Sequence, residues 1–134
     1  MKVLLVLPLV LFLGGSHSAL AADFGGTCGF PFSEDPTAQR EFLDIGNQFQ
    51  VRNVRIAPHP QGVLVQGEIF NNLQGFFTFA LFKVQLFNAD CTYLGANNFA
   101  IDEFKFGVTR PFRVIVPNVE RDQVAMYQIE FLSH

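Results

Sequence analysis

The sequence has no tryptophan, only two cysteines and few charged residues, and these shortages remove several classes of function. Charged residues make up 16% of its 134 residues, and the formal net charge is −3. No run of lysine or arginine forms the basic stripe that binds nucleic acid. The cysteines form no CxxC pair of the kind used in thiol redox or zinc sites. We therefore expect no nucleic acid, metal or other cofactor as a partner.

A long apolar run is also missing, because the apolar stretch near the start covers only residues 3–13. As a helix it would reach about 16 Å, against about 30 Å for the hydrocarbon core of a bilayer. Lys2 precedes it, and Ala19-Leu20-Ala21 fits the small-x-small pattern of signal peptidase sites. We predict a signal peptide over residues 1–21, cleaved after Ala21, and a periplasmic or secreted bacterial protein with no membrane span after cleavage.

The two cysteines, Cys28 and Cys91, are expected to form one structural disulfide in an oxidising compartment. Closing a loop of about 64 residues removes roughly 4 kcal/mol of chain freedom from the unfolded state. A lipoprotein, acylated at Cys28, is the alternative. Residues 25–27, Gly-Gly-Thr, lack the large aliphatic residue that such a site normally carries.

Residues 22–47 are predicted to form an irregular segment with one short helix. Asp35 can cap its start, Pro36 suits the first helical position, and Gly46 can end it. Phe42 and Ile45 would give this helix an apolar edge.

From residue 48 to 134 the apolar residues recur at every second position, which is typical of strands with one buried face. The pattern shifts by one residue near Arg52 and Asn53, which predicts a β-bulge there. Pro111 interrupts the alternation and indicates an edge strand or a bend. Short strands at hairpin spacing predict an all-β fold, an immunoglobulin-like antiparallel β-sandwich of about seven strands.

Residues 63–131 resemble the FxLYD family of extracytoplasmic bacterial immunoglobulin-like domains. The matching segments are residues 65–71 (VQGEIFN), 84–90 (VQLFNAD), 107–114 (GVTRPFRV) and 124–131 (VAMYQIEF). The sequence departs from the family pattern where Val84, Phe87 and Asn88 replace its Phe, Tyr and Asp, and where Cys91 stands at a position that favours Gly. The resemblance implies a β-sandwich outside the cytoplasm and no established chemistry.

Residue types that carry catalysis are sparse and scattered. The predicted mature chain has two histidines, His59 between prolines in a turn and His134 at the last position. Its adjacent acids at 34–35 and 102–103 are expected at turns, where neighbouring side chains point apart and stay solvated. We expect no catalytic site and no metal site, and hence a protein that is not an enzyme.

The candidate interaction surface is aromatic. Phe77, Phe79 and Leu81 are expected on the strand face opposite Phe82. We expect this surface to be covered by the N-terminal segment and its phenylalanines, Phe24, Phe30 and Phe32. The alternative is an exposed patch that binds a partner or a second copy, as in a weak homodimer.

Three functions follow in order of preference. The first is an exported, non-catalytic binding or interaction module of the bacterial periplasm or cell envelope, with a protein or glycan partner. The second is a secreted inhibitor or accessory subunit that inserts one loop, 58–62 or 71–75, into another protein. The third is a small hydrolase or metal carrier.

Overall fold

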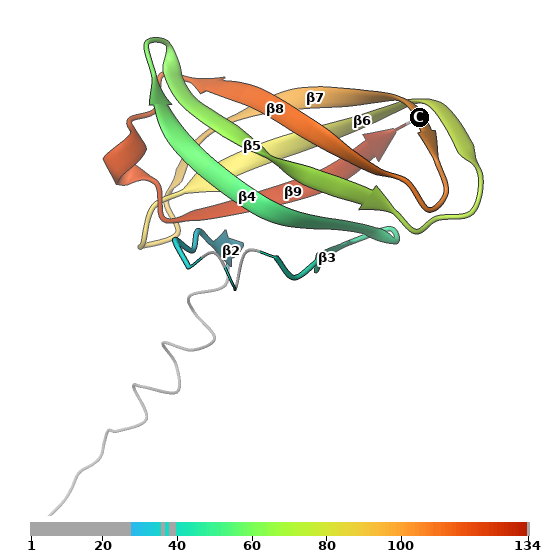
Figure 1. Cartoon of the computed structure of the whole chain (residues 1–134). Coiled ribbons are helices and arrows are strands. Elements are labelled where there is room, and N and C mark those ends of the chain that lie inside the picture. The colour runs from blue at the N-terminus through green and yellow to red at the C-terminus, as the bar shows by residue number, and fades with distance from the viewer. Residues whose placement is uncertain (1–27, 36, 38–39, 134) are drawn as a thin grey trace, which may run out of the picture.

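The computed structural model describes residues 28–35, 37 and 40–133, and this part of the chain is built from strands (Figure 1). The predicted signal peptide and Phe24 lie outside the described residues, as does His134. No helix in the described part is long and apolar enough to cross a membrane. With the labels of Figure 1, the elements are β2 (Phe30–Pro31), β3 (Leu43–Gly46), β4 (Phe49–His59), β5 (Gly62–Asn71), β6 (Phe76–Phe87), β7 (Tyr93–Lys105), β8 (Thr109–Pro117), the short 3-10 helix η2 (Arg121–Gln123) and β9 (Met126–Ser133).

The strands form two four-stranded antiparallel sheets, in the orders β3-β4-β5-β8 and β2-β9-β6-β7. Hairpins join β4 to β5 and β6 to β7 within a sheet, whereas the chain changes sheet between β5 and β6, β7 and β8, and β8 and β9. The prediction of an all-β fold with two packed sheets is confirmed. Pro111 lies in β8, at one end of its sheet, as its missing N–H requires.

The helix predicted between Asp35 and Gly46 is wrong for its second half, because Leu43–Gly46 forms β3 and pairs with β4. Gly46, with φ of +94°, belongs to the turn from β3 into β4 and does not cap a helix. Asp35 does accept a hydrogen bond from the Thr37 N–H at 3.0 Å. Residues 36, 38 and 39 lie outside the described residues. Strands β2 and β3 thus extend the sheets into a segment that was expected to lie outside the sandwich.

The bulge predicted near Arg52 and Asn53 is confirmed. The pairing of β4 with β5 shifts by one residue between Arg52 and Arg55, and Asn53 has φ of +56°. The extra residue lets both halves of β4 bury apolar side chains, Val51 before the bulge and Val54 after it.

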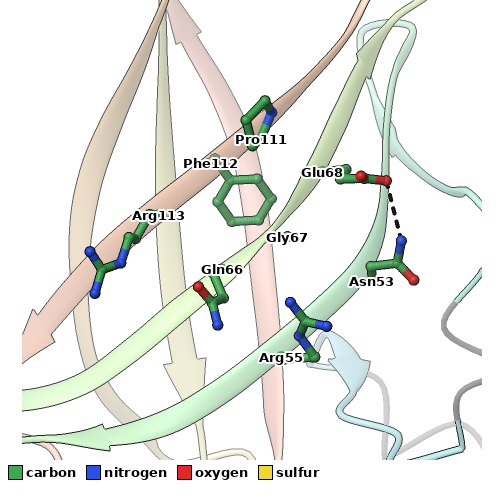
Figure 2. A pocket seen from close by; sticks show the side chains of 8 residues that line it. All are labelled: Asn53, Arg55, Gln66, Gly67, Glu68, Pro111, Phe112 and Arg113. Atoms are coloured by element: carbon green, nitrogen blue, oxygen red, sulfur yellow. Dashed lines mark hydrogen bonds between the residues drawn. The ribbon is translucent and has the colours of Figure 1, made fainter.

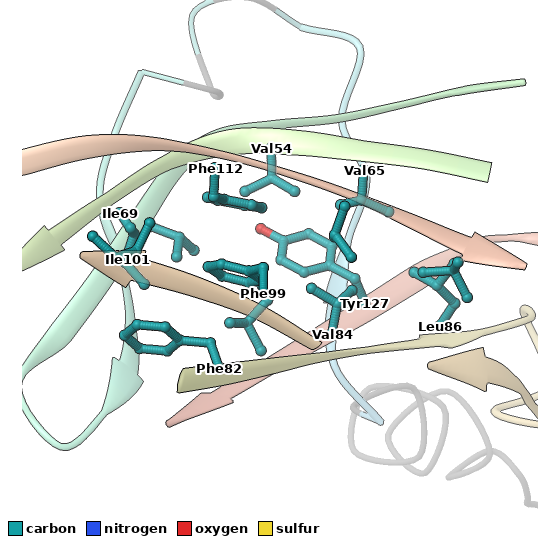
Figure 3. Packing of buried hydrophobic residues seen from close by; sticks show 14 of the residues in the cluster. Val54, Val65, Ile69, Phe82, Val84, Leu86, Phe99, Ile101, Phe112 and Tyr127 are labelled. Atoms are coloured by element: carbon teal, nitrogen blue, oxygen red, sulfur yellow. The ribbon is translucent and has the colours of Figure 1, made fainter. Parts of the chain in front are cut away.

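The core lies between the sheets and is rich in phenylalanine (Figure 3). Phe49 of β4 meets Phe82 of β6 edge to face, with ring centroids 5.0 Å apart. Phe99 of β7 stacks on Phe112 of β8 at 4.6 Å. Each pair joins one sheet to the other, so aromatic contacts hold the two layers together.

The predicted disulfide is confirmed: Cys28 is bonded to Cys91, and their Cα atoms are 5.6 Å apart. It ties the start of the described chain to the turn between β6 and β7. The segment that follows Cys28 places Phe30 and Phe32 against Tyr127 of β9, with ring centroids 5.7 and 4.7 Å apart. Burial raises the pKa of the Tyr127 hydroxyl above its ordinary value.

Candidate functional site

The predicted surface of Phe77, Phe79 and Leu81 does not form as one face. Phe77 is only 8% exposed and lies in the core, 6.1 Å from the Phe49 ring. Phe79 is 45% exposed, and Leu81 is half-buried on the outer face. The prediction is wrong for Phe77 because both β6 and its partner β7 change their buried face near Glu103, whose φ is +51°.

The expected cover is also wrong within the described chain. Phe30 and Phe32 pack against Tyr127 and the core, whereas Phe79 stays exposed. Phe79 and Leu81 lie next to other apolar outer-face residues, since Leu81 pairs with Ala100 of β7 and β9 ends beside it at exposed Leu132. A small apolar patch therefore remains at this end of the sheet.

The residues weighed for chemistry lie apart from one another. His59 closes the β4–β5 turn, where its Nδ1 accepts a hydrogen bond from the Gln61 N–H at 3.1 Å. The backbone carbonyls of Asp102 and Glu103 accept hydrogen bonds from Arg110 Nη1 at 2.9 and 3.4 Å. Glu34 lies 3.8 Å from Arg121. Within the described ranges, no three His, Cys, Asp or Glu residues come together as a metal site would need.

Arginine gathers instead on one sheet. Strands β4, β5 and β8 carry Arg52, Arg55, Arg110 and Arg113, and the single acid in these three strands is Glu68. This concentration occurs in a chain whose formal net charge is −3. Sequence reasoning missed it because the arginines form two pairs, in β4 and in β8, that lie far apart along the chain. Only the pairing of β4 and β8 with β5 brings the two pairs together.

The outer face of this sheet contains a hollow of about 520 Å³, which we call the arginine hollow (Figure 2). Arg55, Gln66 and Arg113 form a row across it, because Gln66 pairs with Arg55 on one side and with Arg113 on the other. Gly67 and Phe112 also line it, and the Phe112 ring is buried on the inner side of the sheet, stacked on Phe99. A Cβ on Gly67 would lie 3.1 Å from the Phe112 ring, so glycine allows this ring to pack closely against β5.

Glu68 borders the hollow and is held by two donors from β4. Its Oε1 accepts hydrogen bonds from Arg52 Nε at 2.6 Å and from Asn53 Nδ2 at 3.2 Å. The hydrogen bond from Arg52 lowers the pKa of Glu68 below its usual value, and the charge of Arg55 adds to this. Arg52 is fixed from its other side by Phe42, whose ring centroid lies 4.4 Å below the guanidinium. Glu68 is thus an ionised, oriented carboxylate.

A second ordered feature lies at the end of the sandwich where β5 leads into β6. The fully buried Asn71 donates from Nδ2 to the Phe104 carbonyl at 3.1 Å, and its Oδ1 accepts from the Leu73 N–H at 2.8 Å. The Phe106 N–H bonds the Gly75 carbonyl at 3.1 Å, which joins the loop after β5 to the loop after β7. Both loops are held in place by these bonds. An exposed phenylalanine adjoins each of them: Phe76 follows the loop after β5, and Phe106 begins the loop after β7.

Comparison with known proteins gives little direct information. No family model matches the chain, and no curated protein matches it. A solved structure similar to this chain is the solution NMR structure of the uncharacterized lipoprotein yajI from Escherichia coli. Their sequences are 11% identical, the TM-score is 0.49, and the match covers 93% of this chain and 82% of that one.

Proposed function

We propose that this protein is an exported, non-catalytic binding module of the bacterial periplasm or cell envelope, and that its partner binds the β4–β5–β8 face. Export is supported by the predicted signal peptide and by the Cys28–Cys91 disulfide, since such bonds persist in oxidising compartments. The arginine concentration on one sheet is the observation that carries the proposal. Arg52, Arg55 and Arg113 outnumber Glu68 on its outer face, and an excess of one charge attracts an oppositely charged partner and orients it.

The strand order supports an immunoglobulin-like topology as part of the proposal. β4, β5 and β8 correspond to strands A, B and E of that fold, and β9, β6 and β7 to F, C and C′. The short β2 pairs with β9 at the place of strand G. This arrangement also agrees with the resemblance of residues 63–131 to the FxLYD family, whose members are expected outside the cytoplasm.

The chemistry of the face supports binding over catalysis. Glu68, its carboxylate, is ionised and engaged by Arg52, so it is a poor proton donor at neutral pH and a weak base. The remaining charged groups are guanidinium groups, which stay protonated and act as hydrogen-bond donors.

Capture from a cell-envelope extract tests the proposal. We expect the disulfide-bonded exported chain to retain a partner, and the variant Arg55→Glu/Arg113→Glu to lose it. The matched control is Lys83→Glu/Lys105→Glu, which reverses two positive charges on the opposite sheet and leaves capture intact. Equal capture by wild type and the arginine variant, or loss only in the lysine variant, would contradict the assignment of the face.

A second candidate is an inhibitor or accessory subunit that uses the loop at 71–75. The buried Asn71 network favours it, because the network holds this loop and the neighbouring one in place and leaves Phe76 and Phe106 53% and 48% exposed. Loss of capture in Phe76→Ser/Phe106→Ser, together with unchanged capture in Arg55→Glu/Arg113→Glu, would select this function. Substitution of loop 58–62, the other candidate loop, is the matched control.

A further inference from the structure

We propose that the arginine hollow binds the carboxylate of an acidic saccharide, such as a polymer of uronic acids. The inference rests on the proposed function of the β4–β5–β8 face and names the ligand class of that face. Three features of the hollow carry it: two available guanidinium groups, a set of free acceptors, and a location over β5 beside a proline of the edge strand.

The two arginines of the row are available to an anion. Neither Arg55 nor Arg113 forms a salt bridge with any described residue. They lie on strands two apart in the sheet, which places their Cα atoms about 10 Å from each other. Since no described group holds their side chains, both can turn toward a carboxylate above Gln66 and donate paired hydrogen bonds to its oxygens.

The rest of the hollow suits hydroxyl groups and a sugar ring. Glu68 uses Oε1 for both of its described hydrogen bonds, so Oε2 remains able to accept one from a hydroxyl. Asn53 engages Glu68 through its amide nitrogen, which leaves its oxygen as an acceptor, and the Gln66 amide can both donate and accept. The exposed ring of Pro111 adds apolar surface beside these groups, against which the carbon atoms of a sugar ring can pack.

The location of the hollow favours a saccharide over an acidic peptide. An extended peptide binds a sheet by adding a strand to a free edge, where backbone groups are available. The hollow lies over β5, which is paired with β4 on one side and with β8 on the other. β8 is the edge strand, but beside the hollow it carries Pro111, which has no N–H to offer an added strand. A ligand in the hollow is therefore recognised by side chains alone. A saccharide can bind in this way, because it does not need backbone hydrogen bonds from a free strand edge.

Isothermal titration of the disulfide-bonded chain tests the inference, with trigalacturonate as the probe, maltotriose as the neutral saccharide and triglutamate as the acidic peptide. We expect trigalacturonate to bind, and Arg55→Gln or Arg113→Gln to weaken its binding about tenfold each, the typical loss for a charge-assisted hydrogen bond. Arg55→Lys/Arg113→Lys keeps both charges but loses the planar fork, and should weaken binding by a similar factor. Lys83→Gln/Lys105→Gln on the opposite sheet should bind as wild type does.

Several outcomes would overturn the inference: no binding of trigalacturonate, full affinity in Arg55→Lys/Arg113→Lys, equal binding of maltotriose, or equal binding of triglutamate. Thermal unfolding of each variant shows that it is folded before titration, which is expected because both arginines lie on the outer face. If trigalacturonate fails while Arg55→Glu/Arg113→Glu still abolishes partner capture, the ligand class is wrong and the function of the face stands. If that variant also captures normally, both proposals fail.

Discussion

Strands β4, β5 and β8 carry four arginines and one glutamate, whereas β6, β7 and β9 carry two lysines and three acids. Their inner faces differ much less, because both sheets bury valine, isoleucine and phenylalanine against each other. The contrast shows that the inner faces, which packing constrains, define the fold. The outer faces are free to differ, and the arginine hollow lies on one of them.

The largest expected effect tests the inner half of this comparison. Phe82→Ala removes a fully buried ring of β6 that contacts Phe49, Phe99 and Phe131, and should lower the free energy of unfolding by about 3–5 kcal/mol. Phe79→Ala, on the same strand but on the outer face, should cost less than about 1 kcal/mol. Urea denaturation measures both. Equal losses would show that the two faces of β6 are not distinct.

The disulfide comes next and concerns the β2-β9-β6-β7 sheet. Cys28→Ser/Cys91→Ser should lower the free energy of unfolding by about 2–5 kcal/mol, because the bridge closes a long loop and holds the segment that covers Tyr127. The denaturation midpoint of the variant should equal that of the wild type unfolded in reducing agent. A midpoint that reduction leaves unchanged would show that the segment packs without the bridge.

Asn71 tests the end of the sandwich where the chain crosses from β5 in one sheet to β6 in the other. Asn71→Ala leaves the Phe104 carbonyl and the Leu73 N–H without their partner, and should cost about 1–3 kcal/mol. Asn72→Ala, at the exposed next position, is the matched control and should change stability by less than about 0.5 kcal/mol. Hydrogen exchange at Phe106 should also accelerate in the first variant and not in the second, because its N–H bonds the neighbouring loop. Unchanged exchange at Phe106 in Asn71→Ala would show that the hydrogen bonds of Asn71 do not hold the two loops in place.

Much of the fold could be predicted because its signals are local. Alternation of apolar residues located the strands, and the shift of that alternation at Asn53 located the bulge. The disulfide between Cys28 and Cys91 followed from the number of cysteines and the predicted compartment.

The errors and omissions come from pairing between distant segments. Phe77 is buried because β7 changes face opposite to it, which the sequence of β6 alone does not contain. Gly46 suits the end of a helix, but Leu43–Gly46 pairs with β4 instead. The arginine hollow exists only once three strands are aligned in register, so no single stretch of sequence indicates it.

The smallest expected effect concerns Glu68 and the charge of the arginine face. Its pKa is lowered in the folded protein, so the folded state favours the ionised form. That stabilisation is present at pH values above the unfolded pKa near 4.5 and is lost as the pH falls through the folded value. The side chain is 37% exposed, and solvent screening limits the contribution to less than about 1 kcal/mol.

Glu68→Gln should therefore be slightly less stable than wild type at pH 7. This difference should be smaller at pH 3, which lies below the ordinary glutamate pKa of 4.5, because part of the stabilisation is then lost. Glu130→Gln removes a carboxylate from the outer face of the opposite sheet and gives the background effect of such a change. Denaturation midpoints of the three proteins at both pH values measure the difference. A gap between Glu68→Gln and wild type that is as large at pH 3 as at pH 7 would mean that Glu68 acts through packing or the geometry of its hydrogen bonds. Its charge would then not organise Arg52 and the arginine face.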